Sequence, residues 1–264
     1  MHEYFLLSEA AAPKAWNSDF FSDWKYRLTL SGDSLPGGVD ITTALPGFPL
    51  PVRLTASNFP FGQAKGDGSD LVVSDGTGRL LAHQIERWDS TAGKAEIWIR
   101  VESLAATKAD RKAVLHWGYE PASRPAAIPS AGSVFRAADG FIGAWHFNEG
   151  GADSTVNEAS SRYAGRIRGA PPAGGRGSLR GEGMVAGGYI LGSTRNYVNV
   201  SYNTAQDVGN SLTVAIWARL NPQDSIVKQL LASKWATGKR EWHFHVHSNR
   251  SLEIEFGDTL GAIQ

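Results

Sequence analysis

Apolar and polar residues alternate with a period of two through much of this chain, and this alternation constrains the fold more than any other feature. Tyr26, Leu28 and Leu30 share one side of such a stretch, and Ile97 and Ile99 share one side of another. Successive side chains of a β-strand point to opposite faces of a sheet, so these stretches predict strands with one buried face. No apolar stripe with helical spacing continues for three turns. The sequence therefore predicts an all-β chain of two β-sandwich domains.

Glycine- and proline-rich segments separate the predicted strands. Residues 74–78 predict a tight turn, and the prolines within residues 46–51 predict a loop because proline cannot donate to a sheet ladder. Pro121, Pro125 and Pro129 predict an extended linker. The predicted organisation is a leader remnant or disordered arm at 1–15, an N-terminal sandwich at 16–120, the linker at 121–133 and a second sandwich at 134–264.

Charge and composition exclude several classes of function. Lys and Arg together number 26, and so do Asp and Glu, so the chain has no basic excess for nucleic acid and we expect no nucleic-acid partner. The absence of cysteine excludes disulfides, thiolate zinc sites and cysteine nucleophiles. No stretch reaches the roughly 18–20 apolar residues of a membrane-spanning helix, so we expect no transmembrane segment.

Residues 16–120 carry several motifs in a fixed order: W-x-Y-R, then a strand pair, then I-E-x-W-D, then a strand with W at its centre. The motif residues are Trp24, Tyr26, Arg27, Asp70, Leu71, Asp75, Gly78, Leu81, Ile85, Glu86, Trp88, Asp89, Ile97, Trp98, Ile99, Val101 and the closing His116, Trp117 and Gly118. In this order the motifs resemble a bacterial domain family of unknown function.

Residues 134–264 resemble a laminin G-like jelly roll of the concanavalin A type, on the segments 144–149, 212–217, 230–234 and 242–256. Such domains continue for several more strands, so the resemblance predicts a jelly roll that is truncated at its C-terminal end. The two domains occur together in exported bacterial proteins, some of which also carry a proton-channel subunit of the MotA/TolQ/ExbB type. The resemblance thus implies an exported protein, in the periplasm or on the cell surface, with envelope proteins among its partners.

The sharpest local feature is a predicted hairpin over residues 241–256. His243, His245 and His247 alternate with apolar residues, and Glu253 and Glu255 alternate with apolar residues on the returning strand. We expect the imidazoles and carboxylates to share the outward face. The row expected to face the core consists of Trp242, Phe244, Val246, Leu252, Ile254 and Phe256.

The register of this hairpin follows from whether its loop has an even or an odd number of residues. His245 opposite Glu253 and His243 opposite Glu255 require a loop with an odd number of residues, most simply 248–250. Such a loop places Asn249 or Arg250 near the left-handed conformation.

Three kinds of ligand suit this hairpin and its surroundings. Tryptophan stacks on sugar rings, and the candidate ligand-binding residues are His243, His245, His247, Trp235, Glu253 and Glu255. Imidazoles two positions apart on a strand can share a metal ion, which makes His243 and His245 candidate metal ligands. Asp153, with Asn157 and Glu158, offers oxygen ligands for calcium, and no other cofactor is expected.

Among the other tryptophans, Trp217 fits a core position, whereas Trp16 and Trp88 lie near turns and are candidates for exposed platforms.

The most favoured function is non-catalytic recognition of a glycan or another cell-surface polymer, as the sensing part of a larger envelope protein. A second hypothesis is a jelly-roll glycoside hydrolase that uses Glu253, Glu255 and Asp258, because carboxylates at alternate strand positions serve such enzymes as nucleophile and acid/base. A third is a structural or adhesion module that binds protein. Apart from these low-ranked carboxylates, the sequence offers no catalytic residues.

Overall fold

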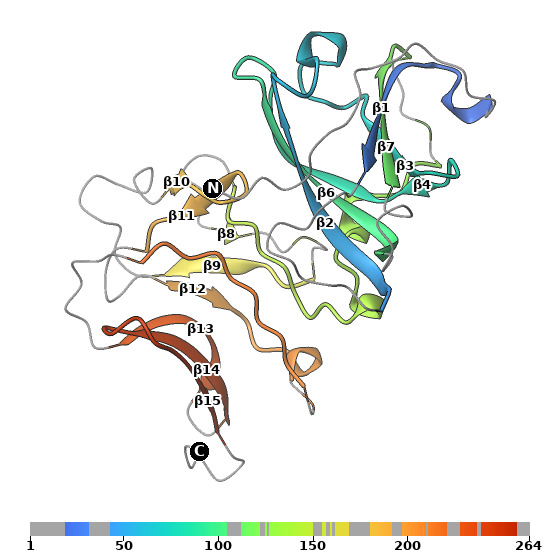
Figure 1. Cartoon of the computed structure of the whole chain (residues 1–264). Coiled ribbons are helices and arrows are strands. Elements are labelled where there is room, and N and C mark those ends of the chain that lie inside the picture. The colour runs from blue at the N-terminus through green and yellow to red at the C-terminus, as the bar shows by residue number, and fades with distance from the viewer. Residues whose placement is uncertain are drawn as a thin grey trace. The chain divides into compact units, whose positions relative to one another are not determined.

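The computed structural model contains strands and short 3-10 turns in its described part, which comprises residues 19–31, 43–104, 112–121, 125, 127–149, 155–156, 159, 162–168, 180–191, 197–207, 209, 211–220, 228–236 and 239–257. All strand pairs in these ranges are antiparallel (Figure 1). The prediction of an all-β chain is confirmed.

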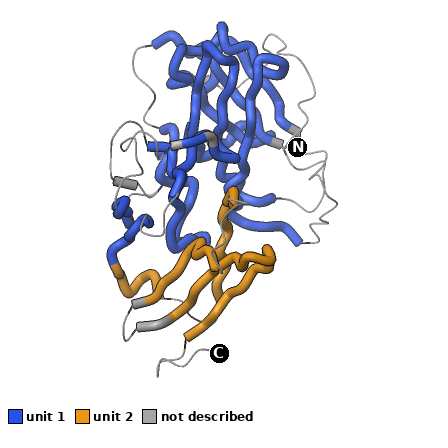
Figure 2. The backbone as a smooth tube through the Cα atoms, turned by 90° about the vertical axis from the view of Figure 1, so that its left-hand side faces the viewer, with its two compact units in different colours: residues 1–201 blue, residues 202–264 orange. Residues whose placement is uncertain are grey.

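The chain divides into two compact units, Met1–Ser201 and Tyr202–Gln264 (Figure 2). The predicted linker at 121–133 lies within the first unit. The predicted division into a sandwich at 16–120 and another at 134–264 stays a prediction.

Two sheets form a sandwich in the N-terminal half of the first unit. Sheet A has the strand order β1-β7-β3-β4, and sheet B has the order β2-β6-β5 (Figure 1). The strands of sheet A are β1 (Trp24–Ser31), β7 (Lys112–Tyr119), β3 (Val72–Asp75) and β4 (Leu80–Leu81). Those of sheet B are β2 (Leu45–Thr55), β6 (Lys94–Leu104) and β5 (His83–Asp89).

The inner faces of sheets A and B supply one hydrophobic core, and the period-two alternation identifies its members. Leu28 and Leu30 of β1 and Ile97 and Ile99 of β6 are buried in it, as their spacing predicts. Trp117 of β7 is fully buried beside them. The core continues through the turn η2 (Phe61–Gln63). Burial of apolar side chains between two layers is the main stabilising contribution of such a sandwich.

The prolines of residues 46–51 lie within β2, so the prediction of a loop there is wrong. Pro46, Pro49 and Pro51 occupy ladder positions opposite β6. Strand β2 is at the edge of sheet B, where a missing N–H group can face away from the ladder. The predicted turn at 74–78 is confirmed, because it joins β3 to β4 with Gly78 at a φ of 92°.

A segment after the sandwich, residues 131–148, packs on the outer face of sheet B, and we call it the covering segment. It contains the turns η4 (Ala131–Ser133) and η5 (Ala137–Asp139). Val134 and Phe135 are buried there, with the ring of Phe135 at 5.3 Å from that of Trp98 on β6. The side chain of Glu86 on β5 is fully buried, and its Oε2 lies 3.0 Å from Nδ1 of His146.

An ion pair fixes the covering segment to β6. The buried Arg100 donates from Nε to Oδ2 of Asp139 at 2.7 Å and from a terminal nitrogen to Oδ1 at 2.9 Å. Gly47 of β2 has a φ of 59°, and an added Cβ atom would meet Cγ of Asp139 at 2.5 Å. Glycine is therefore required at this position for both conformation and space.

The outer face of sheet A carries a smaller apolar cluster. The turn η1 (Asp19–Phe21) brings Phe21 against His116 of β7, with ring centroids 4.1 Å apart and nearly parallel planes. Nε2 of His116 lies 2.9 Å from Oγ of Ser74, and both residues are buried.

The rest of the first unit has two smaller sheets. One has the order β12-β9-β8, and the other pairs β10 with β11. Their strands are β8 (Thr155–Val156), β9 (Gly165–Arg168), β10 (Arg180–Glu182), β11 (Gly187–Tyr189) and β12 (Tyr197–Val200).

The second unit contains the turn η7 (Thr204–Gln206) and one sheet of order β13-β14-β15. Its strands are β13 (Lys228–Ala236), β14 (Lys239–His247) and β15 (Leu252–Phe256). Of the helical segments in the ranges described above, none has the length and hydropathy needed to cross a membrane.

Candidate functional site

The register between β14 and β15 brings the predicted histidines and glutamates together. His243 lies opposite Glu255, and His245 lies opposite Glu253. His247 donates its backbone N–H to the carbonyl of Ser251, which leaves residues 248–250 as the loop, and Arg250 has a φ of 67°. The predicted register, loop length and left-handed residue are all confirmed. We call the side of this sheet that carries these imidazoles and carboxylates the His–Glu face.

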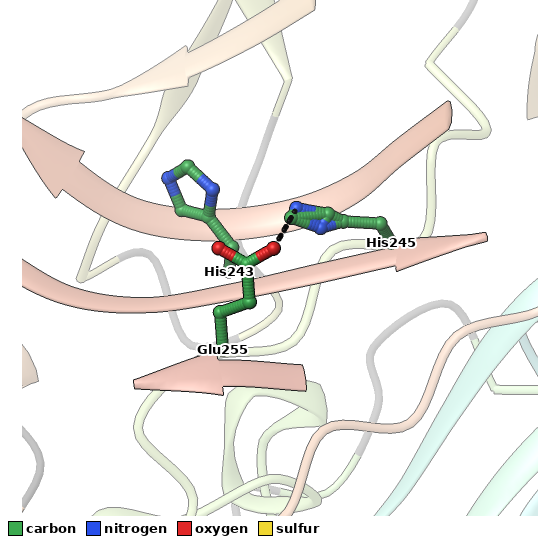
Figure 3. Close-up of side chains that lie close together, drawn as sticks. All are labelled: His243, His245 and Glu255. Atoms are coloured by element: carbon green, nitrogen blue, oxygen red, sulfur yellow. Dashed lines mark ion pairs between the residues drawn. The ribbon is translucent and has the colours of Figure 1, made fainter. Parts of the chain in front are cut away.

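Three side chains of the His–Glu face converge closely enough to share one ligand. One atom each of His243, His245 and Glu255 lies within 4.8 Å of the others. Figure 3 shows the two imidazoles on either side of the Glu255 carboxylate. Nε2 of His245 is 3.7 Å from Oε1 of Glu255, which is longer than a hydrogen bond.

His245 is the buried member of the group. Its residue is only 5 % exposed, and Nδ1 has no hydrogen-bond partner among the described residues. Leaving a buried polar atom unpaired costs about 1–3 kcal/mol, so such atoms in a folded protein call for an explanation.

Lys228 of β13 joins the two carboxylates. Its Nζ is 2.6 Å from Oε1 of Glu255 and 2.8 Å from Oε2 of Glu253. Nε2 of His247 lies 2.6 Å from the same Oε2 of Glu253. The hydrogen bond from Lys228, followed by the contact with His247, lowers the pKa of Glu253 to about 2. Glu253 is therefore ionised near neutral pH.

Trp235 of β13 completes the face. Its ring centroid is 3.8 Å from that of His243, with the planes tilted by 51°. The side chain is partly exposed. An aromatic surface thus adjoins hydrogen-bonding imidazoles and carboxylates, which is the combination found in sites that stack and orient a sugar ring.

The predicted burial of the apolar row is confirmed for Val246 on β14, which is buried, but it is wrong for β15. Leu252, Ile254 and Phe256 on β15 are 67 %, 44 % and 47 % exposed, whereas His245 on the other row is buried. Parity identifies which residues share a face, but the packing of other segments decides which face is covered. Because β15 is at the edge of its sheet, its apolar row has fewer neighbours than the row on β14.

The prediction for Trp217 is also wrong, because Trp217 fits a core position in the sequence and is 63 % exposed. Trp88, a candidate for an exposed platform, packs its ring edge-on against Phe59 and Phe61 beside the main core. A position near a turn does not expose a ring when the turn folds back over it, as the loop at Gly68 does over Trp88.

The structure brings together every predicted ligand-binding residue: His243, His245, His247, Trp235, Glu253 and Glu255. Asp153, Asn157, Glu158, Asp258 and Trp16 lie outside the described residues. Sequence reasoning missed Lys228, which joins the carboxylates. No motif marks it, and the irregular register of β13 near Leu230 hides its place opposite His247.

The pKa of Glu253 limits what this carboxylate can do chemically. A glycoside hydrolase needs one carboxyl group that keeps its proton near neutral pH. Glu253 cannot serve as that acid because its pKa is too low. Glu255 carries an ion pair to the same Lys228.

A family model described as "Domain of unknown function (DUF2341)" matches residues 67–148. The match covers β3 to β7 and the covering segment, and it does not include the His–Glu face. It agrees with the predicted resemblance of the N-terminal half to a domain of unknown function. No curated protein matches the chain. No solved structure matches it either.

Proposed function

We propose that this chain is a non-catalytic recognition module that binds a glycan or another cell-surface polymer on the His–Glu face. One observation carries the proposal: a partly exposed Trp235 adjoins His243 on a face that also presents the carboxylates of Glu253 and Glu255. An indole ring supplies a stacking surface for a sugar, and the polar side chains beside it supply hydrogen-bond partners for hydroxyl groups.

The resemblance of residues 134–264 to a laminin G-like jelly roll supports this proposal, because many such domains bind without catalysis. The same resemblance supports an exported protein, located in the periplasm or on the cell surface, as the sensing part of a larger envelope protein. The low pKa of Glu253 and the ion pairs of Lys228 weigh against the hydrolase hypothesis.

The test is binding to a glycan array that includes bacterial cell-surface polysaccharides and peptidoglycan fragments, followed by titration calorimetry with the best hit. We expect Trp235→Ala to weaken binding by about fivefold or more, since loss of a stacked aromatic ring typically costs more than about 1 kcal/mol. Trp217→Ala is the matched control, because Trp217 is an exposed tryptophan of the same unit outside the His–Glu face. Equal loss in both variants, or release of reducing sugar by the wild type, would contradict the proposal.

A second candidate function, binding of a protein partner, is favoured by the exposed row of Leu252, Ile254 and Phe256. Exposed apolar rows of this kind often mark protein interfaces. Ile254→Lys would then abolish capture of the partner and leave glycan binding unchanged, which separates the two functions.

A further inference from the structure

We propose that His243, His245 and Glu255 bind a divalent transition-metal ion of the zinc class. One ligand atom of each lies within 4.8 Å of the others. Zinc bonds of about 2.0–2.2 Å hold the ligand atoms of a tetrahedral site roughly 3.3 Å apart. Small rotations of the three side chains therefore bring these atoms to bonding distance.

The burial and the hydrogen bonding of His245 support the proposal independently. This imidazole is 5 % exposed, its Nδ1 has no hydrogen-bond partner among the described residues, and its Nε2 is 3.7 Å from the nearest carboxylate oxygen of Glu255. Neither ring nitrogen of this buried imidazole makes a hydrogen bond among the described residues, so Nε2, which lies on the side of Glu255, is available to a metal ion (Figure 3).

The donor set decides the class of metal. Two imidazole nitrogens and one carboxylate oxygen suit zinc and its neighbours in the first transition row. Calcium and magnesium bind through six or more oxygen ligands, which this group does not offer. Three protein ligands leave one tetrahedral position open for water or for an oxygen of a bound molecule.

The charges around the group favour a cation. With neutral imidazoles, Glu253 and Glu255 contribute two negative charges and Lys228 contributes one positive charge, so the face is left with one negative charge. Lys228 contacts Oε1 of Glu255 and also Oε2 of Glu253. It can therefore keep its ion pair with Glu253 while Glu255 turns an oxygen to the metal.

The ring of Trp235 limits the orientations of His243, because the two centroids are only 3.8 Å apart. Neighbours that hold a ligand ring in place raise the affinity of a metal site. The same contact provides a readout, since a paramagnetic ion such as Cu²⁺ or Ni²⁺ bound to His243 would quench the fluorescence of Trp235.

The experiment is calorimetric titration of the whole, untagged, chelator-treated chain with zinc chloride alone. We expect one Zn²⁺ per chain, and at least about tenfold weaker binding in His243→Gln and Glu255→Gln. The variant His247→Gln is the matched control, because His247 is on the same strand but is paired with Glu253 and lies outside the group. Its zinc affinity should stay within about twofold of the wild type.

A visible absorption band with Co²⁺ provides a second measurement that reports tetrahedral nitrogen and oxygen ligands, and near-ultraviolet circular dichroism confirms that each variant is folded. The proposal would be overturned if the chain did not bind zinc at a 100-fold molar excess of the ion, or if it preferred Ca²⁺ to Zn²⁺. It would also be overturned if His247→Gln and His243→Gln lost zinc affinity equally. Because no glycan is present, its failure and the failure of the proposed function are measured separately.

Discussion

His116 shows how burial changes the pKa of a single side chain. It lies on the outer face of sheet A, stacked on Phe21 and bonded to Ser74. Burial, followed by the positive charge of Arg27, lowers its pKa from 6.5 to about 4. The folded chain therefore keeps this imidazole neutral at a pH at which the unfolded chain protonates it.

We expect the chain to lose stability as the pH falls from about 7 to 4. The unfolded chain takes up the proton near pH 6.5 and the folded chain only near pH 4, so protonation favours the unfolded state between these values. The loss is at most about 3 kcal/mol. His116→Gln retains a polar group for Ser74 but does not titrate, so its urea denaturation should show a flatter pH dependence. An unchanged pH profile in this variant would contradict the assignment.

Asp139 is a second residue whose pKa is set by its neighbours. The hydrogen bonds from Arg100 and then from Arg136 lower the pKa of its carboxyl well below the usual range. Asp139→Asn would leave the buried Arg100 with Glu102 as its remaining charge partner among the described residues. We expect a loss of about 2–3 kcal/mol in the free energy of unfolding, measured in urea. Arg136→Gln, on the exposed side of the same carboxylate, should cost less than about 1 kcal/mol.

At the scale of elements, the hairpin of β14 and β15 marks what sequence can and cannot predict. Its register and loop follow from the alternation and from parity, because both are local properties. Which face is covered depends on distant segments, so the exposure of Leu252, Ile254 and Phe256 could not be read from the pattern. The place of Lys228 was hidden for a related reason, since two register irregularities of β13 lie between it and Ala236, the last residue of that strand.

The loop of this hairpin allows a direct test. Arg250 has a φ of 67°, which favours glycine, and Asn249 accepts hydrogen bonds from the backbone N–H and Oγ of Ser251. We expect Arg250→Gly to stabilise the hairpin by about 0.5–1 kcal/mol. Hydrogen exchange of the amides of β14 and β15 should slow by about threefold. Asn249→Ala should speed the same exchange, and faster exchange in Arg250→Gly would contradict this account.

At the scale of the whole molecule, the covering segment links the sandwich of sheets A and B to the chain that follows it. Residues 134–148 carry motifs of the predicted second sandwich, yet they pack on sheet B through Phe135, Asp139 and His146. The proline content predicts a linker but does not show where the chain goes after it. The family match at residues 67–148 spans this segment together with β3 to β7.

Cleavage at a protease site inserted after Pro125 tests this arrangement. We expect the two pieces to stay together on size-exclusion chromatography, because the apolar cluster around Phe135 and the Arg100–Asp139 ion pair hold the covering segment to sheet B. The same cleavage in the Asp139→Ala variant should release more of the N-terminal piece. Complete separation of the wild-type pieces would show that the covering segment contributes little.

The covering segment has a consequence for how such chains arise. The outer face of sheet B is covered mainly by residues 131–148, with Ala159 packing against the same cluster, so exchange of the chain after residue 148 would expose little new apolar surface there. Recombination can then join the module to unrelated C-terminal partners without a compensating change in its strands. The domain boundary at which such exchanges are tolerated would lie after the covering segment. This position is about 20 residues beyond the proline-rich stretch that the sequence alone indicates as the linker.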